Sequence, residues 1–194
     1  SNLTVQTVFD GFNFPTKMAF LGENDILVLE KNDGTVQRIV NGSIKSQVLD
    51  LDVSSKGERG LLGIAVYHRG ELPPYVFLYY TTATADGSDI STNDNDTNSE
   101  NVLYRYEFVE GKLLAPKLLL RLPEKSTWAH NGGAMAIGPD NNLYLAIGDQ
   151  VISDTKAQNI IDGPLPTGNG GILRMTLDGL PVDSGILGNA FPLD

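Results

Sequence analysis

Short apolar runs separated by turn residues dominate this chain, and no run shows a sustained helical period. This pattern predicts an all-β protein. Asn32-Asp33-Gly34 lies between two of the runs and is typical of a hairpin turn. The expected strands are Phe14–Phe20, Asp25–Glu30, Thr35–Val40, Leu61–Tyr67, Tyr75–Thr81, Val102–Phe108, Leu113–Leu120, Gly133–Ile137, Leu143–Ile147 and Gly171–Leu177.

The strands recur as degenerate units. Each unit opens with an apolar-Ala-apolar triplet, continues with a very apolar strand, and then has a strand that carries Arg38, Arg105 or Arg174. Such repeats predict a β-propeller of antiparallel blades with about four strands each. A β-sandwich is the alternative, but the repeat order favours the propeller. The expected blades span roughly 11–56, 57–116 and 117–180 of a single domain, 1–194.

This number of units is small for a ring, because propellers close with about four to eight blades. We therefore expect the chain to be the N-terminal half of a longer propeller. An open arc leaves sheet edges exposed. A homodimer that closes the ring is one hypothesis, and a monomeric mass in solution would contradict it.

The polar run 86–101 interrupts the second unit and predicts a mobile loop, because it cannot bury a core. Asp94-Asn95-Asp96 resembles the start of a calcium loop, but the glycine and distal glutamate spacing of an EF-hand is missing. A solvated loop is therefore the favoured interpretation.

The charge balance is acidic, with 14 Lys and Arg against 24 Asp and Glu, a formal net charge of −10. This argues against nucleic acid or an anionic membrane as a partner. No apolar run is long enough for a transmembrane helix. The chain has no cysteine, which excludes disulfides and thiolate metal ligands. Asn-x-Ser/Thr triplets at Asn2, Asn41 and Asn95 are a weak indication of an extracellular or periplasmic protein.

The segment 126–150 carries the candidate chemistry. His130 precedes two glycines at the start of one expected strand, and Asp149 follows the hairpin partner of that strand. The two side chains can therefore lie side by side, as a general base held by a carboxylate. Asp149 would fix the imidazole tautomer and raise its basicity. The alternatives are a structural histidine and a turn aspartate after Gly148. Trp128 adds a flat face, and Gln150 is a candidate for the same wall.

This segment, together with Gly57-Glu58-Arg59-Gly60-Leu61-Leu62-Gly63, resembles the soluble quinoprotein sugar dehydrogenases of the glucose/sorbosone dehydrogenase family. The resemblance implies a six-bladed propeller that oxidises the anomeric hydroxyl of an aldose with pyrroloquinoline quinone (PQQ), calcium and an external electron acceptor. It also implies that His130 takes the sugar proton and Asp149 holds His130. Glu58 and Trp128 would seat the sugar.

Some positions depart from the family pattern. Glu58 stands where glutamine is common, and Ala129 stands where glucose-oxidising members have aspartate, which predicts a different or broader substrate range. The residues that hold PQQ and calcium in the family lie mostly beyond the matched positions. We therefore expect this chain alone to be inactive.

The remaining candidates carry less chemistry. His68 is interpreted as a surface histidine, and two distant histidines do not make a zinc site. The chain has no nucleotide-binding glycine motif. A non-catalytic propeller that binds a carbohydrate or a protein is the alternative function. A calcium-dependent lactone hydrolase is a third option, but the required ligand set cannot be assembled.

Overall fold

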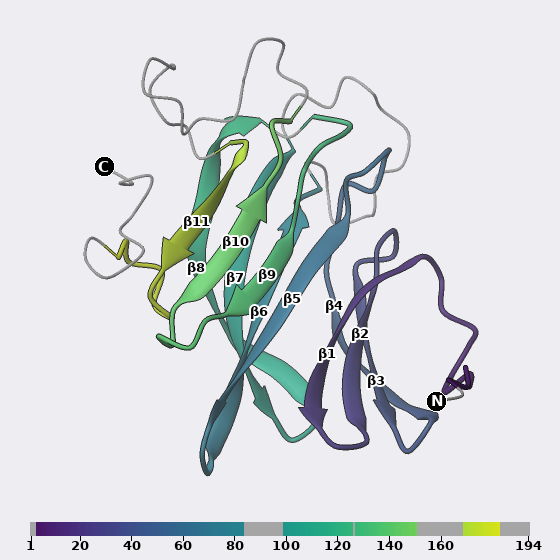
Figure 1. Ribbon diagram of the computed structural model, residues 1–194. Coiled ribbons are helices and arrows are strands. Elements are labelled where there is room, and N and C mark those ends of the chain that lie inside the picture. The colour runs from purple at the N-terminus through teal and green to yellow at the C-terminus, as the bar shows by residue number, and fades with distance from the viewer. Residues whose placement is uncertain (1–2, 84–98, 126, 151–168, 183–194) are drawn as a thin grey trace.

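The computed structural model describes residues 3–83, 99–125, 127–150 and 169–182 (Figure 1). The described residues form strands and turns and no helix, so they include no helical membrane span. All pairings between neighbouring strands are antiparallel, which confirms the all-β prediction.

Three sheets follow one another along the chain. The first contains β1 (Pro15–Gly22), β2 (Asp25–Glu30), β3 (Thr35–Val40) and β4 (Ser43–Asp50). The second contains β5 (Leu61–Arg69), β6 (Leu72–Thr81), β7 (Glu100–Val109) and β8 (Lys112–Lys125). The third contains β9 (Ala134–Ile137), β10 (Leu143–Ile147) and β11 (Gly171–Met175).

Several of the expected boundaries differ from the observed ones, most of all in the second unit. The second sheet continues through β8 to Lys125, past the boundary expected at residue 116. The predicted polar loop, 86–101, lies outside the described residues up to position 98, and its last two residues, Glu100 and Asn101, begin β7.

The strand β4 has no counterpart among the strands that the apolar pattern predicts. It is the outer strand of its sheet and its first residues are exposed, so selection for buried apolar side chains is weak there. Asn41 and Gly42 connect it to β3 with φ values of 50° and 73°. Asn-Gly with both residues left-handed is a strong hairpin signal, and this dipeptide marks β4 in the sequence.

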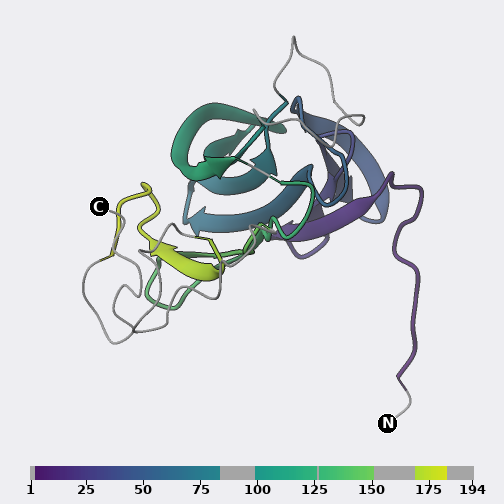
Figure 2. The same ribbon diagram turned by 90° about the horizontal axis from the view of Figure 1, so that it is seen from above.

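The second sheet lies between the other two (Figures 1 and 2). Successive side chains of a strand point to opposite faces. On β6, Leu78 and Tyr80 therefore pack with the first sheet, whereas Phe77 and Tyr79 pack with the third. This two-sided burial explains why β6 reads as a continuous apolar run.

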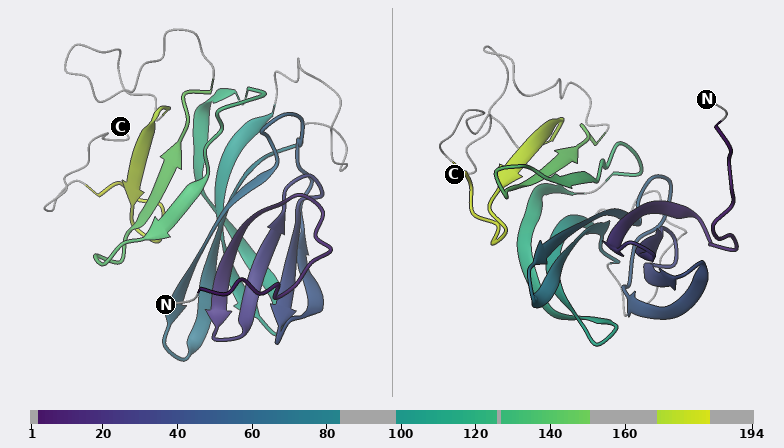
Figure 3. Two further views of the ribbon diagram at one scale, coloured as in Figure 1. Left: turned by 45° about the vertical axis from the view of Figure 1, so that its right-hand side comes forward. Right: turned by 60° about the horizontal axis from the view of Figure 1, so that its bottom comes forward.

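The first strands of the three sheets, β1, β5 and β9, lie next to one another. Strand β1 contacts β5, and β5 contacts β9, while β4 and β8 lie at the outer edges (Figure 3). The segments that precede β5 and β9 are therefore neighbours in space, although about 70 residues separate them in sequence. This neighbourhood builds the site described below.

The repeated arginines hold carboxylates near the strand ends. Arg38 of β3 donates to Asp25 at 2.8 Å, and Arg174 of β11 donates to Asp140 at 2.6 Å. The hydrogen bond from Asn142 does most to lower the pKa of the Asp140 carboxyl, and the bonds from Arg174 and Tyr144 add to it against the opposing effect of desolvation. These pairs are local to one sheet each: the first joins β3 to the start of β2, and the second joins β11 to the turn between β9 and β10.

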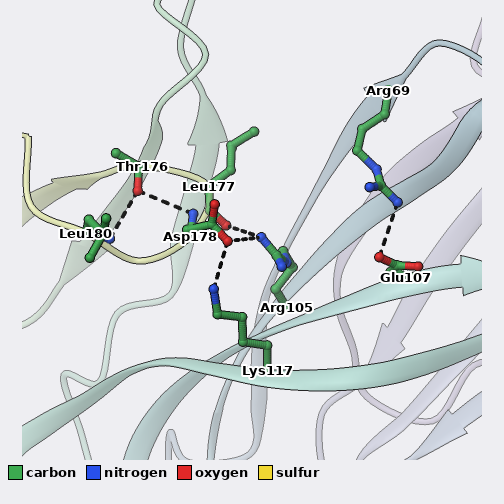
Figure 4. Close-up of polar contacts among 8 residues, drawn as sticks. All are labelled: Arg69, Arg105, Glu107, Lys117, Thr176, Leu177, Asp178 and Leu180. Atoms are coloured by element: carbon green, nitrogen blue, oxygen red, sulfur yellow. Dashed lines mark hydrogen bonds and ion pairs between the residues drawn. The ribbon is translucent and has the colours of Figure 1, made fainter.

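Arg105 instead joins two sheets (Figure 4). Its guanidinium lies 3.9 Å from the ring centroid of Tyr75 and donates to the Leu177 carbonyl and the Asp178 carboxylate, which follow β11. Lys117 of β8 donates to the same carboxylate at 2.7 Å. Two cations of the second sheet thus hold a turn of the third.

The ion pairs of Asp178 with Arg105 and Lys117 should make the free energy of unfolding depend on pH and on ionic strength. Hydrogen bonds from Lys117 and Arg105 lower the pKa of Asp178. A carboxyl whose folded pKa is lowered stabilises the fold above its unfolded pKa of about 4, and the contribution disappears as pH falls through the folded pKa. Because the Asp178 side chain is 60% exposed, Asp178→Asn should cost under about 1 kcal/mol. Urea midpoints at pH 7 and pH 3 measure this difference.

The control for this prediction is Asp10→Asn, at an exposed aspartate outside the cluster. We expect the effect of Asp178→Asn to shrink at pH 3 and in about 1 M salt, because protons and counterions both weaken the ion pairs. An effect that stays the same at both pH values contradicts the electrostatic explanation.

Candidate functional site

His130 lies in the loop that leads into β9 and has a left-handed backbone, with φ of 57°. That conformation costs a non-glycine residue about 1–3 kcal/mol, so the surroundings must hold it. Two glycines let neighbouring backbone segments come close to this loop. A Cβ on Gly148 would overlap the carbonyl oxygen of His130, and a Cβ on Gly57 would overlap the carbonyl oxygen of Trp128.

Asp149 lies beside the imidazole. Ala134 pairs with Ala146, so the segment that precedes β9 and the segment that follows β10 meet at one end of the hairpin. His130 Nδ1 and Asp149 Oδ1 are 2.7 Å apart. The structure thus brings this predicted pair together.

This pairing determines which nitrogen can accept a proton. A neutral imidazole that donates from Nδ1 to the Asp149 carboxylate carries its lone pair on Nε2. The His130 side chain is 56% exposed, and no described residue bonds to Nε2. The arrangement therefore offers an oriented, accessible base at Nε2.

Glu58 contacts the backbone of His130. It lies in the segment before β5, and its Oε2 accepts the backbone N–H of His130 at 2.6 Å. Its own N–H donates to the Trp128 carbonyl at 2.8 Å. Burial lowers the pKa of Lys31, and the nearby Glu58 carboxylate opposes that shift. Glu58 is thus part of the site, with a cation close by.

The other predicted residues occupy different environments. Trp128 is 54% exposed at the rim of the site. Gln150 is buried, and its backbone N–H donates to the His130 carbonyl at 3.3 Å. Ala129 is also buried, with its carbonyl accepting from the Thr127 hydroxyl. His68 is exposed on β5, outside these contacts.

A buried network of hydrogen bonds lies beneath the loop that carries His130, and no sequence motif predicts it. The Tyr79 hydroxyl donates to the Asn131 carbonyl at 3.0 Å, and the Asn101 amide donates to Asn131 Oδ1 at 2.8 Å. Thr81 donates in turn to Asn101. These residues come from two strands and a loop far apart in sequence, so only the folded chain brings them together. Buried networks of this kind make a loop rigid.

The cations of the site loops already have partners. Lys31 Nζ donates to Asn32 Oδ1 and to the Ser55 carbonyl, and Arg59 Nε donates to the Thr127 carbonyl. Within the described ranges, no group of three or more His, Asp or Glu side chains could hold a metal ion. The Asp94-Asn95-Asp96 candidate for calcium lies outside those ranges.

Comparisons with known proteins bear on the same segments. A family model described as Glucose / Sorbosone dehydrogenase matches residues 12–190. Quinoprotein glucose dehydrogenase B of Acinetobacter calcoaceticus is 26% identical over 204 residues, which cover 94% of this chain and 41% of that protein. The chain thus spans less than half the length of this curated relative.

Two solved structures are similar over most of the chain. An oxidoreductase described as a glucose dehydrogenase, from Thermus thermophilus, is 29% identical with a TM-score of 0.76, covering 96% of this chain and 50% of that one. The PQQ-bound form of aldose sugar dehydrogenase from Streptomyces coelicolor is 29% identical with a TM-score of 0.75, covering 96% and 52%.

Proposed function

Since this chain belongs to the glucose/sorbosone dehydrogenase family, we propose that it supplies the proton-transfer side of a quinoprotein sugar dehydrogenase site. The observation that carries the proposal is the 2.7 Å contact between His130 and Asp149, which leaves Nε2 accessible, with an exposed tryptophan two positions earlier in the same loop. In this proposal the three sheets are blades of a six-bladed propeller, and the loops before β5 and β9 face the substrate.

The proposed reaction begins with an aldose whose anomeric hydroxyl lies at His130 Nε2. The imidazole accepts the hydroxyl proton, and Asp149 stabilises the imidazolium that forms. PQQ, when bound, supplies the redox chemistry by accepting the hydride that leaves the anomeric carbon. Trp128 offers a flat apolar face on which a sugar ring can lie. Because the buried Ala129 brings no carboxylate to the sugar, the proposed substrate range differs from that of glucose-oxidising members.

The described residues fit only part of a site for PQQ. They supply the base, its carboxylate partner and an aromatic face. PQQ is a polyanion, and Lys31 and Arg59 already donate to carbonyl oxygens of the protein. In this proposal the cofactor's carboxylates and calcium are therefore held by residues outside the described part. A large share of the binding energy would come from there.

The test is a calorimetric titration with PQQ in the presence of calcium, carried out on this chain and on the full-length gene product. We expect the full-length protein to bind PQQ and to reduce a dye with an aldose, and this chain alone to show no turnover. Dye-linked turnover by the chain alone contradicts the idea of a partial site. Failure of the full-length protein to bind PQQ favours the non-catalytic propeller.

A further inference from the structure

We propose that Glu58 is a positioning residue for the base: its carboxylate holds the backbone N–H of His130 and so directs the imidazole toward Asp149. This inference rests on the proposed role of His130 as the base. It differs from the expectation that Glu58 acts by seating the sugar, because one carboxylate oxygen is already engaged inside the protein.

The bond itself is of a strong kind. His130 N and Glu58 Oε2 are 2.6 Å apart, slightly shorter than the about 2.7–2.9 Å typical of charge-assisted N–H···O hydrogen bonds to a carboxylate. The donor belongs to a residue with φ of 57°, a conformation that side chains other than glycine rarely adopt. A hydrogen bond to the backbone N–H of His130 therefore helps to hold this unusual φ, which sets the direction in which the imidazole extends from the backbone.

Glu58 is itself held in place by the loop that it supports. Its N–H donates to the Trp128 carbonyl at 2.8 Å, while its side chain accepts from His130, so two bonds join the same two segments in opposite directions. The neighbouring Arg59 is buried and adds a third bond, from Nε to the Thr127 carbonyl at 3.0 Å. Such reciprocal bonding leaves the carboxylate little freedom to move away from His130.

The charge of Glu58 has a nearby counterpart. Its carboxylate raises the pKa of Lys31 against the lowering effect of burial, so the two charges interact. Lys31 is fastened by its bonds to Asn32 and to the Ser55 carbonyl. A cation held in this way lies close enough to interact with the carboxylate that accepts the His130 N–H.

Two carboxylates thus orient one residue from opposite ends. Asp149 holds the imidazole at Nδ1, and Glu58 holds the backbone at N. Loss of the backbone contact should displace Nε2 from the sugar hydroxyl, and displacement of about 1 Å can cost about 100-fold in rate. Such a loss lowers kcat, whereas loss of a sugar contact raises KM.

The experiment compares Glu58→Ala and Glu58→Gln in the PQQ-loaded full-length protein. We expect Glu58→Ala to lower kcat by about 10–100-fold with KM changed by less than about threefold. Glu58→Gln should restore most of kcat, because its amide oxygen can accept the same N–H. The control is Glu71→Ala, at an exposed glutamate in the turn between β5 and β6, which should leave both constants unchanged.

A second readout needs neither sugar nor cofactor. Hydrogen exchange of the His130 amide, followed by NMR without PQQ, should be slow in the parent protein and in Glu58→Gln and faster in Glu58→Ala. The positioning role is overturned if Glu58→Ala raises KM and leaves kcat and the exchange rate unchanged. Because exchange does not depend on turnover, its result stands even if the protein oxidises no sugar, so the two proposals can fail separately.

Discussion

Replacement of His130 by alanine should lower kcat of the PQQ-loaded protein by about 10²–10⁴-fold, the usual contribution of a positioned general base. The imidazole Nε2 is the accessible acceptor of the site, because Nδ1 is engaged with Asp149 at 2.7 Å. Asp149→Asn should also lower kcat, because an amide neither fixes the tautomer nor stabilises the imidazolium as a carboxylate does. Dye-linked steady-state kinetics with an aldose measure both effects.

The chain contains its own control for this prediction. His68 is the other histidine, exposed on β5 and outside the contacts of the site, so His68→Ala should leave kcat and KM unchanged. PQQ binding should survive in all three variants, because none of these side chains holds the cofactor in the proposal. Full activity in His130→Ala would show that His130 is not the general base.

Replacement of Phe77 by alanine should lower the free energy of unfolding by about 3–5 kcal/mol. Phe77 is fully buried on β6, one of the two central strands of the second sheet, among side chains from β10 and β11. Truncation leaves a cavity where the second and third sheets pack, and close-packed neighbours can fill it only in part. Urea unfolding with an unchanged m-value measures the loss as a shift of the midpoint.

Two further variants separate cavity formation from a general effect of substitution. Phe77→Leu should recover most of the loss, because it refills most of the volume. Leu114→Ala, on the outer strand β8 with Leu114 49% exposed, should cost no more than about 0.5 kcal/mol. Equal losses at Phe77 and Leu114 would contradict the position of the core between the sheets.

The strand predictions agree with the structure at well-buried strands, and the one strand that they miss is a weakly buried outer strand. The expected β2 and β3, Asp25–Glu30 and Thr35–Val40, agree with the structure at both ends. β4 is absent from the prediction, because an outer strand needs few apolar side chains. The hairpin dipeptide Asn41-Gly42 was the available signal for it, because it determines a local backbone conformation independent of burial.

The repeated arginines illustrate a different limit. Their spacing marks the three units in the sequence, but only Arg38 and Arg174 have corresponding partners, each a carboxylate within its own sheet. Arg38 binds a carboxylate of its own sheet, whereas Arg105 reaches Asp178 beyond β11. Equivalent positions in a repeat share a backbone environment, while the ion pairs depend on which neighbouring turn supplies an acid.

The sequence by itself determined the all-β class, most strands and the meeting of His130 with Asp149. These follow from local patterns, since alternation determines a strand and one hairpin determines which of its ends meet. The tertiary structure decided the role of Glu58, the burial of Gln150 and the network beneath Asn131. Those contacts join loops and strands of different sheets. Their geometry depends on how the sheets pack, which residue spacing along the chain does not encode.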